Sequence, residues 1–239
     1  MRTFTMRTDA PSSRPLSHFR PSHFALSHSM LITALQPHPR NPERVAVHVD
    51  GEERLSLAAE LVLAEALRTG DEIDEARLAE LEARDQKWRA REAALTLLSY
   101  RPRSAAELRR RLARKGFGED VVDECVEALA GAGVVDDDAF AEVFVRDRVR
   151  LRPHGARRLR QELRAKGVDA DTAAAAVEEV MEGEDASEID LARAASARWR
   201  PRAGEAPDRA RRRLHAFLAR RGFGGDAIRQ VLEEKLGSC

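Results

Sequence analysis

One ten-residue pattern occurs three times in this chain, and it constrains the fold more than any other feature. The copies span 108–117, 159–168 and 214–223, and each holds two leucines four residues apart, then a basic residue, a glycine and an apolar residue. A period of about fifty residues is typical of a repeat architecture. Because leucines at this spacing share a helix face and glycine favours the left-handed turn after a helix, each copy predicts helix, tight turn, helix.

The similarity continues beyond each glycine, where an aspartate follows four residues later and apolar residues follow at six and ten. We expect this aspartate to cap the next helix, with Asp169 as the alternative to Asp171 in the second repeat. No single helix of this kind can bury its apolar face alone, so neighbouring repeats must stack. The sequence therefore predicts a mostly α fold: three tandem three-helix repeats, at 90–135, 136–183 and 184–239, in an elongated curved array.

A small module with β-strands is predicted before the repeats, at 30–74. Valines alternate with other residues over 45–49, Asp50-Gly51 suits a two-residue hairpin turn, and alternation resumes after it. A third strand is expected at 31–35. Polar residues at 75–89 predict a helical connector that runs into the first repeat.

Residues 1–29 are rich in Ser, Pro, His, Arg and Thr and have no apolar period, so we predict a disordered tail. A natural start at Met30 is an alternative hypothesis for this stretch. The only two cysteines, Cys125 and Cys239, form no metal-ligand pattern, which favours a reduced, cytoplasmic setting. The sequence has no run of 18 apolar residues, so it predicts no membrane span.

The net charge is zero, with 41 basic and 41 acidic residues, but the charges are segregated. Seven basic residues and one acid lie between Arg101 and Lys115, whereas eight acids and no lysine or arginine lie between Glu119 and Asp138. Two interpretations remain open. The charges are either solvated helix faces that complement helix dipoles, or a basic stripe repeated along one side of the array.

Several segments resemble one family, closely in the first two repeats and more loosely in the third. They are 103–109, 115–117, 133–141, 145–148, 159–163, 166–168 and, in the third repeat, Leu214, Leu218 and 221–223. Through them the chain resembles the RecX family of bacterial regulatory proteins over about 90–237. The resemblance implies binding to RecA filaments on single-stranded DNA, along the filament groove. It also implies inhibition of the ATPase, strand exchange and coprotease activities of RecA, in recombinational DNA repair and the SOS response.

No phosphate-binding loop, zinc spacing or catalytic constellation is found, so we predict a non-enzymatic protein without cofactor or metal that acts by occupying a surface. The candidate contacts to filament or DNA are basic residues of the second helices: Arg109, Arg110, Arg114, Lys115, Arg157, Arg160, Arg164, Lys166, Arg212, Arg220 and Arg221. A basic residue at a helix C-terminus also stabilises the helix dipole, by about 0.3–1 kcal/mol, without any partner. Trp88 is expected to cap the first repeat or to stack on a base.

The predicted partners are the RecA filament and single-stranded DNA, bound directly or through RecA, by a monomer that does not engage membranes. The alternative is a helix-turn-helix-like DNA-binding protein that acts without RecA. Against it, the net charge is zero, and no helix combines Asn or Gln with Arg in the manner of a base reader.

Overall fold

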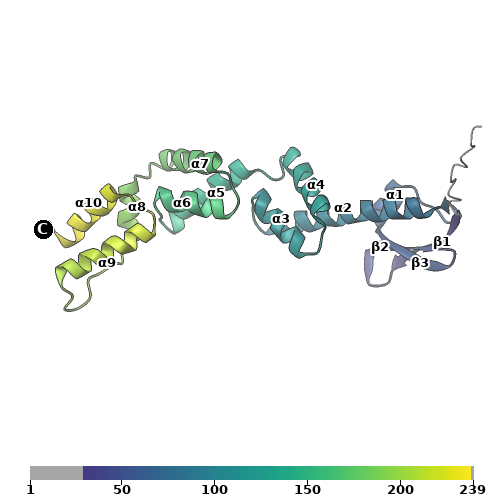
Figure 1. The fold of residues 1–239 in the computed structure, drawn as a ribbon, viewed down its shortest axis with the longest axis horizontal. Coiled ribbons are helices and arrows are strands. Elements are labelled where there is room, and N and C mark those ends of the chain that lie inside the picture. The colour runs from purple at the N-terminus through teal and green to yellow at the C-terminus, as the bar shows by residue number, and fades with distance from the viewer. Residues whose placement is uncertain (1–28, 238–239) are drawn as a thin grey trace, which may run out of the picture.

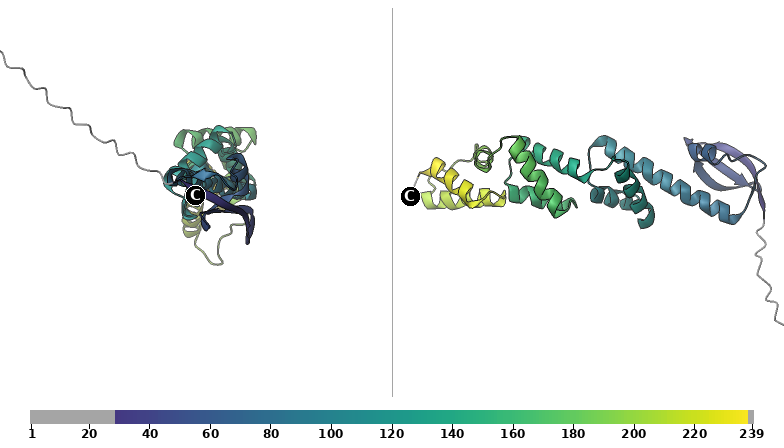
Figure 2. Two further views of the ribbon diagram at one scale, coloured as in Figure 1. Left: turned by 90° about the vertical axis from the view of Figure 1, so that its right-hand side faces the viewer. Right: turned by 90° about the horizontal axis from the view of Figure 1, so that it is seen from above.

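The computed structural model describes residues 29–237, so the predicted tail, apart from Ser29, and Cys239 lie outside the described residues. Ten α-helices and four strands follow one another along the described part of the chain. They form an elongated body, with the sheet at one end and the last helices at the other (Figures 1 and 2). The predicted fold class, three helical repeats behind a small β-containing module, is confirmed.

The N-terminal module is an antiparallel sheet of four strands in the order β3-β2-β1-β4. Its elements are β1 (Met30–His38), β2 (Asn41–Val49), β3 (Glu52–Ala58), α1 (Ala59–Ala64) and β4 (Glu72–Ile73). The predicted hairpin is present, because Asp50 and Gly51 connect β2 to β3 with φ of 51° and 88°. A two-residue hairpin turn of type I′ needs this left-handed backbone at both positions. The short β4 is a strand that the sequence analysis does not anticipate.

A single long helix, α2 (Glu75–Tyr100), joins this module to the first repeat. Its Asp85 side chain is buried, where it pairs with Arg44 of β2 at 2.9 Å and accepts the N–H of Ala58 at 2.8 Å. A buried carboxylate is retained only when such partners compensate its lost hydration. The predicted connector at 75–89 and the first helix of repeat 1 are therefore one continuous element that is fastened to the sheet.

Three helices make up each repeat: α2, α3 and α4 in repeat 1, α5, α6 and α7 in repeat 2, and α8, α9 and α10 in repeat 3 (Figure 1). Their bounds are α3 (Ala105–Arg114), α4 (Glu119–Gly131), α5 (Asp137–Leu151), α6 (Ala156–Ala165), α7 (Ala170–Gly183), α8 (Glu188–Ala195), α9 (Pro207–Arg220) and α10 (Gly225–Leu236). All six leucines of the repeated pattern have 0% exposure, as predicted: Leu108, Leu112, Leu159, Leu163, Leu214 and Leu218. The glycines after them, Gly116, Gly167 and Gly222, have φ of +92°, +90° and +82°.

The helix caps differ from the expectation. The N-cap residues of α4, α7 and α10 are Gly118, Asp169 and Gly224, each two residues beyond the turn glycine. The aspartate four residues beyond each glycine is consequently the second residue of its helix and not the cap. The expectation is wrong for Asp120, Asp171 and Asp226, because the turn is shorter than the spacing suggests, whereas the alternative in the second repeat, Asp169, is confirmed. These carboxylates still lie where negative charge stabilises the helix dipole.

The apolar interior is divided into three clusters. One lies between the sheet and the start of α2, and a second belongs to repeat 1 alone, around Leu108, Leu112 and Val126. The third is continuous over repeats 2 and 3 and extends from Phe140 to Leu232. Repeats 2 and 3 thus share a core, whereas repeat 1 has its own.

Candidate interaction surface

Charge is divided between the helices of each repeat. The second helices are basic: α3 and α6 each carry four arginines and one acid, and α9 carries five arginines and one acid. The third helices α4 and α7 carry five and four acids and no lysine or arginine. In Figure 1, α3, α6 and α9 lie along one long side of the body, and α4, α7 and α10 lie along the other. The body therefore has a basic side and a more acidic side.

The predicted contact residues fall into two groups according to what their side chains meet. Within residues 29–237, one group is exposed and forms no ion pair or side-chain hydrogen bond: Arg114, Lys115, Arg164, Arg212 and Arg220. Arg160 is half-buried and also lacks such a partner there. The other group, described next, has partners inside the molecule.

Arg109 pairs with Asp123 of α4 at 2.7 Å, within repeat 1. Both side chains are more than a third exposed, and an ion pair of this kind contributes about 0–1 kcal/mol. The pair joins α3 to α4 but costs little to exchange for another partner. Arg109 therefore stays available for contact, but unlike Arg114 it must first give up a partner within the repeat.

The N-terminus of α3 docks on the turn that follows α6. Ser104, the N-cap of α3, donates its hydroxyl to the carbonyl oxygen of Lys166 at 2.7 Å, and the Arg110 guanidinium reaches the same oxygen at 3.4 Å. The approach is close, because a Cβ added to Gly167 would lie 2.2 Å from the Cβ of Ala106. Repeat 1 is thus attached to repeat 2 by a helix N-terminus on a tight turn.

Repeat 2 docks on repeat 3 through the same kind of contact. Gly155, the N-cap of α6, donates its N–H to the carbonyl oxygen of Arg221 at 2.9 Å. Arg157 donates to a main-chain carbonyl in the last turn of α9 at 3.2 Å. A Cβ on Gly222 would lie 2.4 Å from the nitrogen of Arg158. In both of these joints between repeats, a helix N-terminus therefore lies against a turn that consists of a basic residue and a glycine.

The basic residue before each turn glycine meets three different environments. The ammonium of Lys166 lies 3.8 Å from Glu107, and the guanidinium of Arg221 lies 3.7 Å from the ring centre of Phe217. Burial lowers the pKa of Arg221. Lys115 is exposed. Since all three residues are helix C-caps, the helix-dipole interpretation fits each of them, while Lys115 is also free to meet a partner.

Glu107 contacts several basic residues at the joint between repeats 1 and 2. Its carboxylate is 12% exposed, bonds to Arg103 at 2.9 Å and also accepts from Arg101. Burial by itself would raise the pKa of Glu107, but the hydrogen bond and charge of Arg101, with the charges of Lys166 and Arg103, outweigh it and lower the pKa. Glu107 therefore stays ionised at neutral pH, and its single negative charge partly offsets the three positive charges around it.

The third repeat ends the array differently. α9 has fourteen residues, whereas α3 and α6 have ten, and the additional turn precedes Leu214. Ala210, which aligns with the two N-cap residues Ser104 and Gly155, consequently lies inside the helix and is 1% exposed. Repeat 3 therefore lacks the helix N-terminus with which the first two repeats dock.

Neither tryptophan is fully buried. Trp199 is covered by the guanidinium of Arg213, 4.4 Å from the ring. Trp88 is half-buried on α2, and its indole N–H donates to Glu60 of α1 at 3.1 Å. Trp88 thus connects α2 to the N-terminal module, and the base-stacking hypothesis for it stays a prediction.

Among the described residues, no three or more His, Cys, Asp or Glu side chains are grouped to hold a metal ion. No helix between residues 29 and 237 combines the length and apolar character needed to cross a membrane. Stacked repeats with a charged surface instead define a helical-repeat protein whose charged side chains face outward along an extended body.

Comparison with known proteins assigns this protein to a family. Models of the first, second and third three-helix domains of RecX match residues 90–129, 136–177 and 187–232. The regulatory protein RecX of Corynebacterium efficiens is 34% identical over 212 residues, which cover 84% of this chain and 95% of that protein. The regulatory protein RecX of Halorhodospira halophila is 43% identical over 140 residues, covering 58% of this chain and 83% of that one. The chain belongs to the RecX family, and its role is that of a regulatory protein.

A solved structure agrees with this fold. The crystal structure of a regulatory protein RecX superposes with a TM-score of 0.64 at 21% identity, over 86% of this chain and 100% of that chain. A second, RecX from Lactobacillus salivarius, gives a TM-score of 0.50 at 22% identity over 63% of this chain and 96% of that one. At these identities the likeness concerns the fold alone.

The residues that form the two joints do not follow from the repeated pattern. Ser104 accepts the N–H of Glu107 as a helix cap and also donates to the next repeat, and only the first of these bonds is local to its helix. The available signal is the small residue at the same position in both docking helices, Ser104 and Gly155, followed by an alanine in each. Small residues at matching positions permit close approach of two backbones.

Proposed function

We propose that this protein binds RecA filaments on single-stranded DNA and inhibits or modulates the ATPase, strand exchange and coprotease activities of RecA, in recombinational repair and the SOS response. The observation that supports this proposal best is the basic side of the array, where exposed arginines recur on α3, α6 and α9. A filament repeats its own surface at regular steps. A body that presents similar charges at successive repeats can contact several filament subunits at once.

The joints favour this mode of action because they set the spacing between the basic helices. Each joint combines hydrogen bonds with a backbone approach that only glycine permits. Contacts on connected repeats benefit from a high effective concentration, so weak individual contacts add to a useful affinity. A protein bound across neighbouring subunits would oppose filament growth and the changes in filament geometry linked to nucleotide hydrolysis. Its affinity should fall as salt rises, because the contacts are ionic.

We expect the double substitution Arg110→Ser and Arg114→Ser to weaken inhibition of RecA about tenfold, which corresponds to about 1.4 kcal/mol of binding free energy. The two side chains are exposed and form no ion pair within residues 29–237. Arg110 gives up only a 3.4 Å hydrogen bond to the carbonyl oxygen of Lys166, which keeps its 2.7 Å bond from Ser104, so the substitutions should leave the fold intact. Arg109 is left unchanged, because losing its ion pair with Asp123 would change the stability of repeat 1 as well as the binding of RecA. The measurement is the RecA ATPase rate on single-stranded DNA as a function of inhibitor concentration.

The matched control is Arg40→Ser with Arg68→Ser, which removes the same charge from exposed positions of the N-terminal module. This variant should inhibit like the wild type. Undiminished inhibition by a folded Arg110/Arg114 variant would reject α3 as part of the contact surface.

A further inference from the structure

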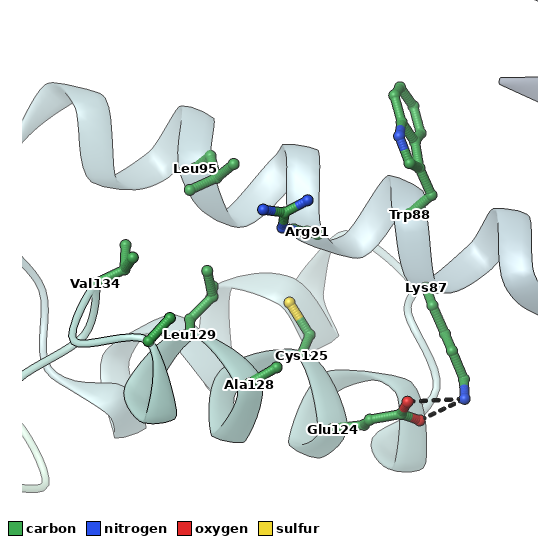
Figure 3. Close-up of a pocket in the computed structure, with 10 residues that line it drawn as sticks. Lys87, Trp88, Arg91, Leu95, Glu124, Cys125, Ala128, Leu129 and Val134 are labelled. Carbon is green, nitrogen blue, oxygen red and sulfur yellow. Dashed lines mark hydrogen bonds and ion pairs between the residues drawn. The ribbon is translucent and has the colours of Figure 1, made fainter. Parts of the chain in front are cut away.

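A groove lies between α2 and α4 of repeat 1 (Figure 3), with a volume of about 440 Å³. Its lining is mainly apolar: Leu95, Cys125, Ala128, Leu129, Ala132 and Val134. Figure 3 shows the side chains of Cys125 and Leu129 directed from α4 toward α2. Lys87 pairs with Glu124 at one end of the groove, at 2.6 Å, and Val134 is 48% exposed. The side chain of Arg91 also lines the groove.

The same place in repeat 3 is spanned by an ion pair. Arg193 of α8 bonds to Glu234 of α10 at 2.6 Å. Arg91 and Arg193 correspond, because each follows an alanine of 0% exposure in the first helix of its repeat. Ala128 and Glu234 correspond as well, because each lies twelve residues beyond the turn glycine of its repeat. Repeat 1 therefore retains the cation but has an alanine in place of the carboxylate.

Repeat 2 has different ion pairs at this place. Arg146 and Arg150 of α5 lie 3.6 and 2.7 Å from Glu184, which follows α7. Arg146 corresponds to Leu95 in repeat 1, and Glu184 corresponds to Gly133. Repeat 1 thus has neither the ion pair of repeat 3 nor those of repeat 2. Arg91 forms no ion pair within residues 29–237 and lies beside an open apolar surface.

We propose that this groove binds a segment of a partner protein that carries an apolar side chain and a carboxylate. The carboxylate would pair with Arg91 as Glu234 pairs with Arg193, and the apolar side chain would cover Leu95 and Leu129. An ion pair beside apolar walls is less screened than one in water, and burying the apolar lining adds to the binding. The proposed function identifies the RecA filament as the source of this segment, and the inference rests on that function.

The deciding variant is Ala128→Glu, which supplies the missing carboxylate from within the chain. It should pair with Arg91, close the groove and lower the affinity for RecA filaments on single-stranded DNA about tenfold. Ala130→Glu, at an exposed position of the same helix that does not line the groove, adds the same charge and should bind like the wild type. Circular dichroism and thermal melting verify that both variants are folded, and fluorescence anisotropy of each variant, labelled at its N-terminus and titrated with filaments, measures binding.

Cys125 provides an independent readout, because its thiol lines the groove and is 9% exposed. In a Cys239→Ser background, alkylation of Cys125 by iodoacetamide should slow several-fold on filaments and remain unchanged with single-stranded DNA alone. If the wild type binds filaments but Ala128→Glu binds equally well and Cys125 is not protected, the groove proposal is overturned and the proposed function stands. If the wild type does not bind filaments, both are overturned. Protection by single-stranded DNA alone would also overturn it, because the occupant would then be nucleic acid.

Discussion

Replacing Gly222 with alanine should lower the free energy of unfolding of repeats 2 and 3 by about 2–5 kcal/mol, whereas Gly116→Ala should cost repeat 1 only about 1–2 kcal/mol. Both glycines have a left-handed backbone, with φ of +82° and +92°, so both substitutions carry the same conformational strain. The surroundings differ. A Cβ at Gly222 would lie 2.4 Å from the nitrogen of Arg158, while a Cβ at Gly116 has nothing within 4 Å.

Urea unfolding followed by circular dichroism measures the two losses, and hydrogen exchange assigns them to repeats. Gly116→Ala serves as the matched control because it reproduces the backbone strain without the clash. Equal losses for the two variants would show that the contact between α6 and the turn after α9 does not hold the repeats together.

Leu112→Ala and Leu163→Ala should each cost about 2–5 kcal/mol, because both leucines have 0% exposure in a packed interior. The extent of the damage should differ. Leu112 belongs to the core of repeat 1 alone, whereas Leu163 belongs to the core shared by repeats 2 and 3. We therefore expect Leu112→Ala to reduce hydrogen-exchange protection in α2, α3 and α4 only, and Leu163→Ala to reduce it from α5 through α10.

Leu151 offers a control for these substitutions, since it is a leucine near the end of α5 with 77% exposure. Leu151→Ala should change the free energy of unfolding by less than about 0.5 kcal/mol. Loss of protection throughout the helical part in both core variants would contradict the division into two helical cores.

Most of the fold could be predicted from the repeated pattern, because that pattern reflects local structural requirements. A buried leucine pair and a left-handed glycine are each properties of one helix and its turn, so they can be predicted from spacing. The joints could not be predicted in this way. The hydrogen bond from Ser104 to Lys166 joins two neighbouring repeats, which local spacing does not reflect. Gly167 is needed both for its turn and for its close approach to Ala106.

The candidate surface was predictable only in part. The sequence shows where arginines occur, but their availability depends on partners that folding brings together. Arg101 and Arg103 meet Glu107, and Arg109 meets Asp123, whereas Arg114 has no such partner within the described residues. The open groove of repeat 1 could not be predicted either, because its walls come from α2 and α4, which only folding brings together.

Co-sedimentation with RecA filaments on single-stranded DNA tests the central claim most directly. Single-stranded DNA alone and duplex DNA alone serve as the comparisons, each at low and at physiological salt. We predict that the wild-type chain sediments with the filaments at both salt concentrations, and that it binds more weakly at physiological than at low salt. Tight, sequence-selective binding to duplex DNA, together with no binding to the filaments, would contradict the account and favour a DNA-binding protein that acts without RecA.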